Sequence, residues 1–439
     1  MSPLPRLLLF SLLTTTLAIG TACTVQPGNP NAPVTQASPL ASPAASTAAS
    51  PVASPSAAQA SVQVTLPLLD ALLADKPFVD ELKNKLKLSD DQIESIKHTS
   101  QAEIDRLRAS NAEETDTDET DAPKRAAEQL SSIVGEDKAH QLAALANDYW
   151  AKGAPAAAGE AAPSEQFQML KGPNAVPTDT RVVVNIPAFR MDVFQDGSLV
   201  KTYKVGIGYP EFPLPLGLRK AQSVIFNPSW TPPDSPWVAK MKNTTPGEKI
   251  EPGSKDNPLG PIKIPIGLPS LIHGGKSPAR IGKFASHGCV GLTTPQMKDF
   301  TALLLRAARN DVSEQEMNSY LADKTRTKSV KLDNVIPVEL RYETIVLEDG
   351  KLHIYKDVYA QHTNTEENLR RVLEANGARL EDLTEQQRQQ ALDALKSQPK
   401  GEVVIDVPEL GQKGYPVAVN LDDGKGKPQI TPSKKKKSA

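Results

Sequence analysis

The amino-acid sequence predicts a multidomain α+β protein: a small α-helical module, then a β-rich domain of sandwich-like or barrel-like architecture with a helix on the side of its functional site. Three observations predict this class. The chain has 439 residues, more than one hydrophobic core usually organises. Apolar residues recur at helical spacing from about Leu66 to Trp150. Near Arg181 a strand-like pattern replaces that spacing, so helices should come first and a sheet second.

Composition limits the kinds of partner. Fifty basic residues oppose fifty-two acidic ones, and the net charge is −2. Such a balance provides no global field for an anionic polymer, so no nucleic-acid partner is expected. Aromatic residues make up only 5%, and the chain contains 38 prolines, which indicates that part of it is extended rather than packed.

The N-terminus is typical of an exported protein. Residues 1–22 contain one basic residue, Arg6, followed by an apolar run of about 13 residues from Leu7 to Ile19. This run is shorter than the roughly 20 residues that span a bilayer, which favours a signal peptide. Small residues before Cys23 resemble a bacterial lipoprotein processing site, which implies lipidation of Cys23; ordinary cleavage before Cys23 is the alternative. We expect a periplasmic or envelope location, with membrane contact through a lipid anchor only.

Two segments separate the signal from the sheet. Residues 23–61 are rich in Pro, Ala, Ser and Thr and lack hydrophobic periodicity, which predicts a tether. Residues 62–165 form the predicted helical module, in which a capping box at Ser89-Asp90-Asp91-Gln92 should start a helix. The acidic run from Glu113 to Asp121 is predicted to be a solvated loop.

The β-rich domain is predicted at residues 175–345. A hairpin is expected where Asp196-Gly197 separates the strand Met191–Gln195 from the strand Leu199–Ile207. Thr294-Pro295 should begin a helix, with Thr294 as its N-cap and an apolar face that includes Phe300.

Residues 346–439 are predicted to be a C-terminal extension. Around its start, a strand pair between Ile336 and about Tyr355 should bracket Asp349-Gly350. The run Lys434–Lys437 is predicted to end the chain as a solvated basic tail.

The residues best suited to chemistry fall within one short stretch. His273, His287 and Cys289 lie within seventeen residues, in a chain with six histidines and two cysteines. Cysteine catalysis needs a thiolate, which a nearby imidazole can generate. Gly274 and Gly288 allow close approach of the backbone, as an oxyanion site requires. From the residues alone, two alternatives stay open: a zinc site made by the same three side chains, and a buried thiol beside structural histidines.

These residues also resemble a known family. His273-Gly274 followed by Ser286-His287-Gly288-Cys289 matches the signature of the L,D-transpeptidase catalytic domain (YkuD-type), in its periplasmic peptidoglycan cross-linking branch. The resemblance covers roughly residues 178–345. Further motifs occur in the order of that family: Val184-Asn185-Ile186-Pro187, Val205-Gly206-Ile207-Gly208, Asn227-Pro228-Ser229-Trp230-Thr231-Pro232 and Asn257-Pro258-Leu259-Gly260.

The resemblance implies roles for individual residues. Cys289 would attack the L-to-D peptide bond of a peptidoglycan stem tetrapeptide and form a thioester. His273 would transfer protons, held by a backbone carbonyl close to Gly274. Backbone N–H groups around His287, Gly288 and Cys289 would hold the oxyanion, with Ser286 among the neighbouring groups. His287 would support the site or contact substrate. No cofactor or metal is implied, and the acceptor would be a second stem peptide, a protein or water.

The sequence departs from this family at two positions. Gly291 stands where periplasmic members usually have Arg, and Leu214 replaces a usual Thr. The missing guanidinium removes a bidentate donor for a carboxylate. Two other functions therefore remain open from the sequence: a catalytically weak wall-binding or scaffolding lipoprotein, and an L,D-carboxypeptidase of the same fold.

Overall fold

The computed structural model describes residues 64–110, 122–152, 167–233, 238, 241, 243–267, 270–411 and 413–426. The predicted signal peptide, Cys23, the tether, the acidic loop and the basic tail lie outside these residues. No helix in the described part combines the length and the apolar character needed to cross a membrane.

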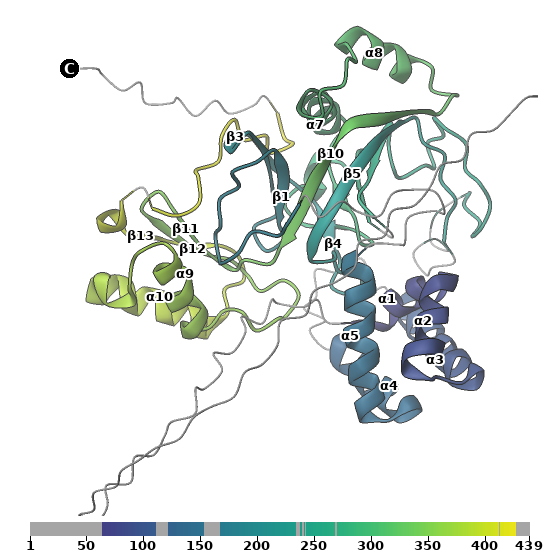
Figure 1. Ribbon diagram of the computed structural model, residues 1–439, viewed down its shortest axis with the longest axis horizontal. Helices are drawn as coiled ribbons and strands as arrows, with labels where there is room; N and C mark the ends of the chain where they lie inside the picture. Colours follow the sequence, from purple (N-terminus) through teal and green to yellow (C-terminus); the bar gives the residue numbers. More distant parts are fainter. Residues whose placement is uncertain are drawn as a thin grey trace, which may run out of the picture. The chain divides into compact units, whose positions relative to one another are not determined.

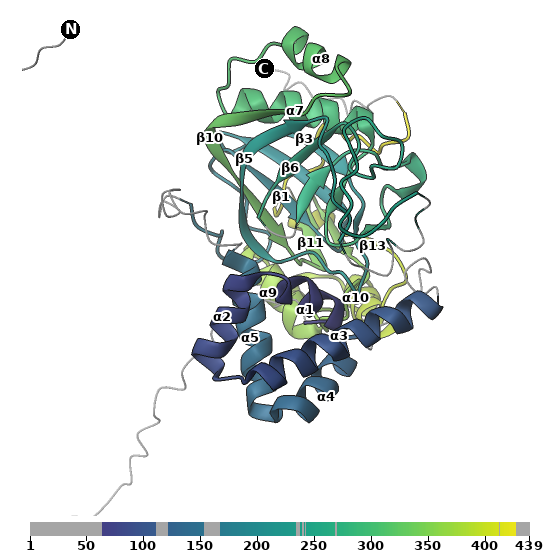
Figure 2. The ribbon, with the colours of Figure 1, turned by 90° about the vertical axis from the view of Figure 1, so that its right-hand side faces the viewer.

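In the residues that the structure describes, the predicted helical module contains five helices: α1 (Leu66–Leu73), α2 (Lys76–Leu86), α3 (Asp90–Ser110), α4 (Ala122–Val134) and α5 (Glu136–Lys152). They gather in one bundle around a shared apolar core (Figure 2). The predicted capping box starts α3: Ser89 N donates to Gln92 Oε1 at 3.1 Å, and Gln92 N donates to Ser89 Oγ at 3.2 Å. These bonds satisfy two of the N–H groups that a helix start leaves open.

The β-rich domain is built on a curled eight-stranded sheet with the order β3-β2-β1-β10-β5-β6-β7-β9. β10 pairs in parallel with β1 and antiparallel with β5 (Figure 1). The strands are β1 (Arg181–Asn185), β2 (Arg190–Gln195), β3 (Ser198–Lys204), β5 (Gly217–Phe226), β6 (Ile262–Pro265), β7 (Leu271–His273), β9 (Val290–Gly291) and β10 (Lys328–Arg341).

The predicted hairpin joins β2 to β3. Asp196 and Gly197 both have positive φ, 48° and 78°, as a tight two-residue hairpin turn requires. The second strand is shorter than predicted, because the chain leaves the large sheet after Lys204. It then forms β4 (Ile207–Gly208), which pairs in parallel with β8 (Phe284–Ser286) in a separate two-stranded sheet.

Helix α7 (Thr294–Ala307) packs on the core of this domain, but its N-cap is Thr293 and not the predicted Thr294. Thr293 has extended backbone and stands three residues before Gln296, so the two side chains cap each other's backbone N–H. Met297, Phe300 and Leu304 are buried on the predicted apolar face. The shorter helix α8 (Glu314–Ala322) follows.

The chain after β10 forms a second, antiparallel sheet of β11 (Ile345–Glu348), β12 (Lys351–Ile354) and β13 (Val403–Asp406). Asp349-Gly350 forms the turn between β11 and β12, as predicted. The predicted start of this strand pair was wrong, because Ile336 belongs to β10 and pairs with β5 in the large sheet, and the pair begins at Ile345. Helices α9 (Glu366–Ala375) and α10 (Glu385–Ser397) bury their apolar faces on this sheet (Figure 1). Short 3₁₀ helices occur at η2 (Pro278–Arg280), η3 (Leu380–Asp382) and η4 (Pro408–Leu410).

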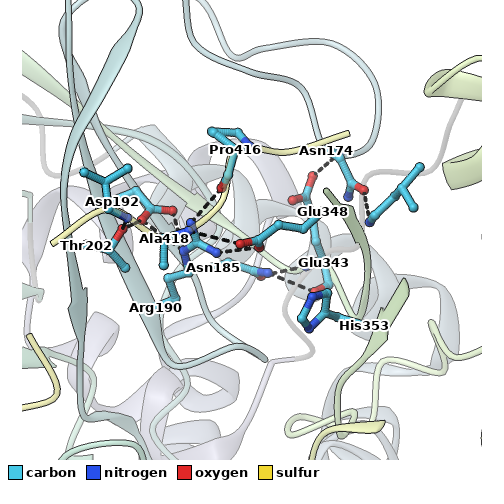
Figure 3. Close-up of polar contacts among 12 residues, drawn as sticks. Asn174, Asn185, Arg190, Asp192, Thr202, Glu343, Glu348, His353, Pro416 and Ala418 are labelled. Atoms are coloured by element: carbon cyan, nitrogen blue, oxygen red, sulfur yellow. Dashed lines mark hydrogen bonds and ion pairs between the residues drawn. The ribbon is translucent and has the colours of Figure 1, made fainter. Parts of the chain in front are cut away.

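A network of charged and polar groups joins the two sheets (Figure 3). Arg190 on β2 donates to Asp192 at 3.0 Å, to Glu348 on β11 at 2.7 Å and to the carbonyl of Pro416 at 3.0 Å. Glu348 in turn accepts from the N–H of Ala418 at 3.1 Å. Since these groups are largely shielded from water, each depends on its partners, and the C-terminal segment is fixed against β2.

Candidate active site

The sheet brings the predicted residues together. His273 is the last residue of β7, and its register partners are Lys263 on β6 and Gly291 on β9. Cys289 lies immediately before β9, where its thiol receives a backbone hydrogen bond from Leu271 at the start of β7. His273 thus lies on β7, and Cys289, sixteen positions later in the chain, lies just before β9, the strand paired with β7.

His273 is held in one orientation. Its side chain is buried, and Nδ1 lies 2.8 Å from the carbonyl oxygen of Gly274, the neighbour expected from the sequence. A carbonyl can only accept, so Nδ1 carries the hydrogen and Nε2 has the lone pair. Burial and the positive charge of Lys276 lower the pKa of His273 to about 3. The ring is therefore neutral at physiological pH and can act as a base.

Cys289 is a free, half-buried cysteine. Burial raises the pKa of its thiol, although the backbone of Leu271 and the charges of Lys276 and Lys263 oppose that rise. The thiol consequently rests in its protonated form at neutral pH. Since the thiol and the imidazole are both neutral, attack by Cys289 would require proton transfer during the reaction rather than a preformed ion pair.

The turn before Cys289 is closed by Ser286. Ser286 Oγ accepts a hydrogen bond from Cys289 N at 3.0 Å and donates one to the carbonyl of the same residue. Gly288 has φ +91°, a conformation that glycine adopts without strain. Of the expected oxyanion donors, the Cys289 N–H is engaged by Ser286, whereas the Gly288 N–H has no acceptor among the described residues.

His287 packs in an aromatic wall beside this turn. Its ring centroid lies 5.4 Å from that of Tyr209 and 4.8 Å from that of Phe212, the latter contact being edge-on. These neighbours belong to the segment that follows β4. His287 therefore shapes the surroundings of the turn, while His273 lies on β7, the strand paired with β9.

Sequence reasoning missed three residues of this region. Tyr359 lies beyond β12, yet its hydroxyl donates to the carbonyl of Gly208 at 2.9 Å and accepts from Leu214 N at 3.2 Å. Lys263 and Lys276 both place positive charge near Cys289. The alternating pattern of β6 could have indicated that Lys263 and His273 share a face, but Tyr359 carries no local signal.

Metal ligation was an alternative from the sequence. In the described part of the chain, no group of three or more His, Cys, Asp or Glu side chains is arranged to hold a metal ion.

Comparisons with known proteins all point to L,D-transpeptidases as the proteins that this chain resembles. Residues 179–325 match the family model described as the L,D-transpeptidase catalytic domain (YkuD). A curated Haemophilus influenzae protein named "Putative L,D-transpeptidase" is 25% identical over 220 residues, which cover 40% of this chain and 44% of the relative. The chain thus spans less than half the length of that relative.

Solved L,D-transpeptidase structures are also similar to part of the chain. The catalytic domain of the E. faecium L,D-transpeptidase is 17% identical with a TM-score of 0.25, and the match covers 38% of this chain and 99% of that one. The L,D-transpeptidase from Mycobacterium smegmatis is 17% identical with a TM-score of 0.23, covering 37% of this chain and 58% of that one.

Proposed function

We propose, from the L,D-transpeptidase-type catalytic domain at residues 179–325, that this protein cross-links peptidoglycan stem peptides, or attaches a protein to them, through an acyl-enzyme on Cys289. One observation supports this most directly. His273 is a neutral imidazole whose Nδ1 is committed to the Gly274 carbonyl, which leaves Nε2 as the base for a thiol on the turn just before the neighbouring strand β9.

The first half of the reaction forms a thioester. His273 Nε2 takes the Cys289 thiol proton as sulfur attacks the carbonyl that precedes the terminal D-residue of a stem tetrapeptide. The carbonyl oxygen becomes an oxyanion, for which the N–H of Gly288 is the available donor. The C–N bond then breaks, and the imidazolium returns its proton to the departing amine.

The second half transfers the acyl group. An amine of a second stem peptide or of a protein attacks the thioester, and His273 takes a proton from that amine. The C–S bond breaks, and the Cys289 thiolate is reprotonated by the imidazolium. Water in place of the amine would give an L,D-carboxypeptidase with the same residues in the same roles.

The proposal extends to location. We place the enzyme in the periplasm or cell envelope, exported by residues 1–22 and anchored through a lipid on Cys23. The sequence pattern around Cys23 supports this. Radiolabelled palmitate should label the wild-type chain in cells and should not label Cys23→Ala.

Purified tetrapeptide fragments test the reaction. The full chain should release the terminal D-residue and carry a transient mass increase equal to the remaining acyl group. Cys289→Ala should abolish both signals, and His273→Asn should slow acylation by about 10²- to 10⁴-fold. Release that persists in Cys289→Ala would refute the assigned nucleophile. A competition between an amine and water as acceptor then separates transpeptidase from carboxypeptidase.

A further inference from the structure

Three strands place a row of residues across the site. Lys263 on β6 is the register partner of His273 on β7, and His273 is the register partner of Gly291 on β9. Residues paired across neighbouring strands project from the same face of a sheet. The base candidate is thus flanked by a lysine on one side and by a position with no side chain on the other.

Lys276 fills that empty position. A Cβ added to Gly291 would lie 2.8 Å from both Cγ and Cε of Lys276 and 3.3 Å from its Cδ. The backbones are fixed there, because Gly291 and Gly206 exchange two N–H to carbonyl bonds of 2.9 Å, and Lys276 N donates to Leu292 O at 3.0 Å. Gly291 does not have positive φ. Its lack of a side chain therefore provides space for Lys276 rather than an unusual backbone conformation.

This lysine has no acidic partner in the described part of the chain. The charged groups that affect it are Cys289, on the turn before β9, and Arg280 of η2. Arg280 itself donates to the Tyr209 hydroxyl at 3.2 Å. Burial lowers the pKa of Lys276 to about 8, so the ammonium is still mostly charged at neutral pH. Lys263 on β6 is likewise half-buried, and Cys289 is the one charged group among the described residues that acts on its pKa.

We propose that Lys276, lying over Gly291 beside Cys289, binds the free α-carboxylate of the D-residue that leaves the donor peptide. This rests on the proposed function. The carboxylate belongs to the residue directly after the attacked carbonyl, roughly 3.5 Å further along an extended chain. A cation next to the nucleophile is within reach of that group, and an ammonium without a counterion in a shielded site favours a carboxylate. In this chain Lys276 thus supplies the positive charge that Gly291 cannot.

Two donor peptides distinguish binding of the carboxylate by Lys276 from an effect of Lys276 on the Cys289 thiol. One is the tetrapeptide with a free C-terminal carboxylate, and the other is its C-terminal amide. Lys276→Met should lower kcat/KM for the acid roughly 10- to 100-fold more than for the amide, because the loss of its charge near the thiol and the imidazole affects both donors alike, whereas the loss of carboxylate binding affects only the acid. Lys298→Met, an exposed lysine on α7, is the matched control and should change neither value.

A second pair of variants keeps the test independent of folding effects in Lys276→Met. Gly291→Ala retains the lysine but displaces it, and should lose preference for the acid donor in the same way. Gly291→Arg combined with Lys276→Met should restore part of that preference, because a cation returns to the same space.

Equal losses on the acid and the amide would overturn the proposal, since the lysine would then act on the thiol instead of the substrate. Unchanged kinetics in Lys276→Met would also overturn it. If wild-type protein releases no D-residue from either donor, the proposed function itself fails and this inference fails with it. If wild type is active but Lys276→Met keeps its preference for the acid, only this inference fails.

Discussion

Tyr359→Phe tests whether the C-terminal part of the chain holds the loop beside Cys289. Tyr359 lies outside the residues that match the catalytic-domain family, which end at 325. Its ring is buried and stacks on Phe284 and Tyr342, with centroid separations of 6.4 and 5.8 Å. Phenylalanine keeps that ring and removes only the hydroxyl. The change therefore isolates the two hydrogen bonds that the hydroxyl makes.

The expected loss of unfolding free energy follows from the two backbone groups that lose their hydrogen-bond partner. Without the hydroxyl, the buried carbonyl of Gly208 loses a 2.9 Å donor and the buried Leu214 N–H loses a 3.2 Å acceptor. Unsatisfied buried groups of this kind cost about 1–3 kcal/mol of unfolding free energy. Each kcal/mol corresponds to about 2–4 °C in a domain of about 150–250 residues, so that loss should lower the melting temperature by roughly 2–12 °C.

Activity should fall as well. A Cβ placed on Gly208 would be only 3.2 Å from Gly288 N, so these two backbones are in close contact. A shift of the loop should therefore disturb the proposed oxyanion donor and reduce kcat/KM by about tenfold, equivalent to about 1.4 kcal/mol.

The assays are thermal unfolding by circular dichroism and release of the D-residue from tetrapeptide. Tyr320→Phe is the control, because Tyr320 is a half-buried ring packed on Phe226 whose hydroxyl makes no hydrogen bond with described residues. A Tyr359→Phe protein with unchanged melting and unchanged kinetics would refute the reasoning.

Three further outcomes are expected. Gly208→Ala places a Cβ 2.1 Å from Phe212 O and should lower the free energy of unfolding, measured with denaturant, by at least about 2 kcal/mol. Gly401 is exposed with open space around it, so the control Gly401→Ala should change that free energy little. Burial of neutral His273 should contribute fully to the free energy of unfolding above pH 6.5, and this contribution should be lost as the pH falls from about 6.5 toward the folded-state pKa of about 3. His273→Asn should therefore flatten the dependence of unfolding free energy on pH in this range. A dependence identical to that of wild type would contradict the assignment. Arg190→Met leaves the buried carboxylates of Asp192 and Glu348 without their cation, so it should lower the free energy of unfolding by about 3–5 kcal/mol. It should also make residues 414–426 more susceptible to limited proteolysis. Resistance equal to that of wild type would count against this network.

Much of the secondary structure could be predicted because its signals are local. Apolar spacing and the capping box at Ser89 indicated the helical module, and Asp196-Gly197 and Asp349-Gly350 marked two hairpin turns that the structure contains. The N-cap of α7 was misplaced by one residue, since two consecutive threonines give the same local signal. Only the backbone conformation of Thr293 and its bonds with Gln296 distinguish them.

The sequence by itself also determined which residues to consider for chemistry. A lone thiol at Cys289, two histidines and their glycines lie close together in the chain, so their association needed no knowledge of the fold. The spacing could not show where the two histidines lie relative to Cys289. Strand pairing places His273 on β7 beside β9, whereas His287 packs against Tyr209 and Phe212, and we propose His273 as the base for that reason.

Tertiary structure alone decided the remaining features of the site. The side chain of Lys276 occupies the space over Gly291, and Tyr359 reaches the carbonyl of Gly208 from 151 positions away in the chain. The hydroxyl of Ser286 accepts the Cys289 N–H because the turn brings the two groups together, not because of the residue types alone. Such contacts depend on strand register and on the volume left by neighbouring side chains. Local sequence patterns encode neither quantity. The reason for a glycine at position 291 therefore becomes clear only in the tertiary structure, where the side chain of Lys276 occupies the space that a side chain at Gly291 would fill.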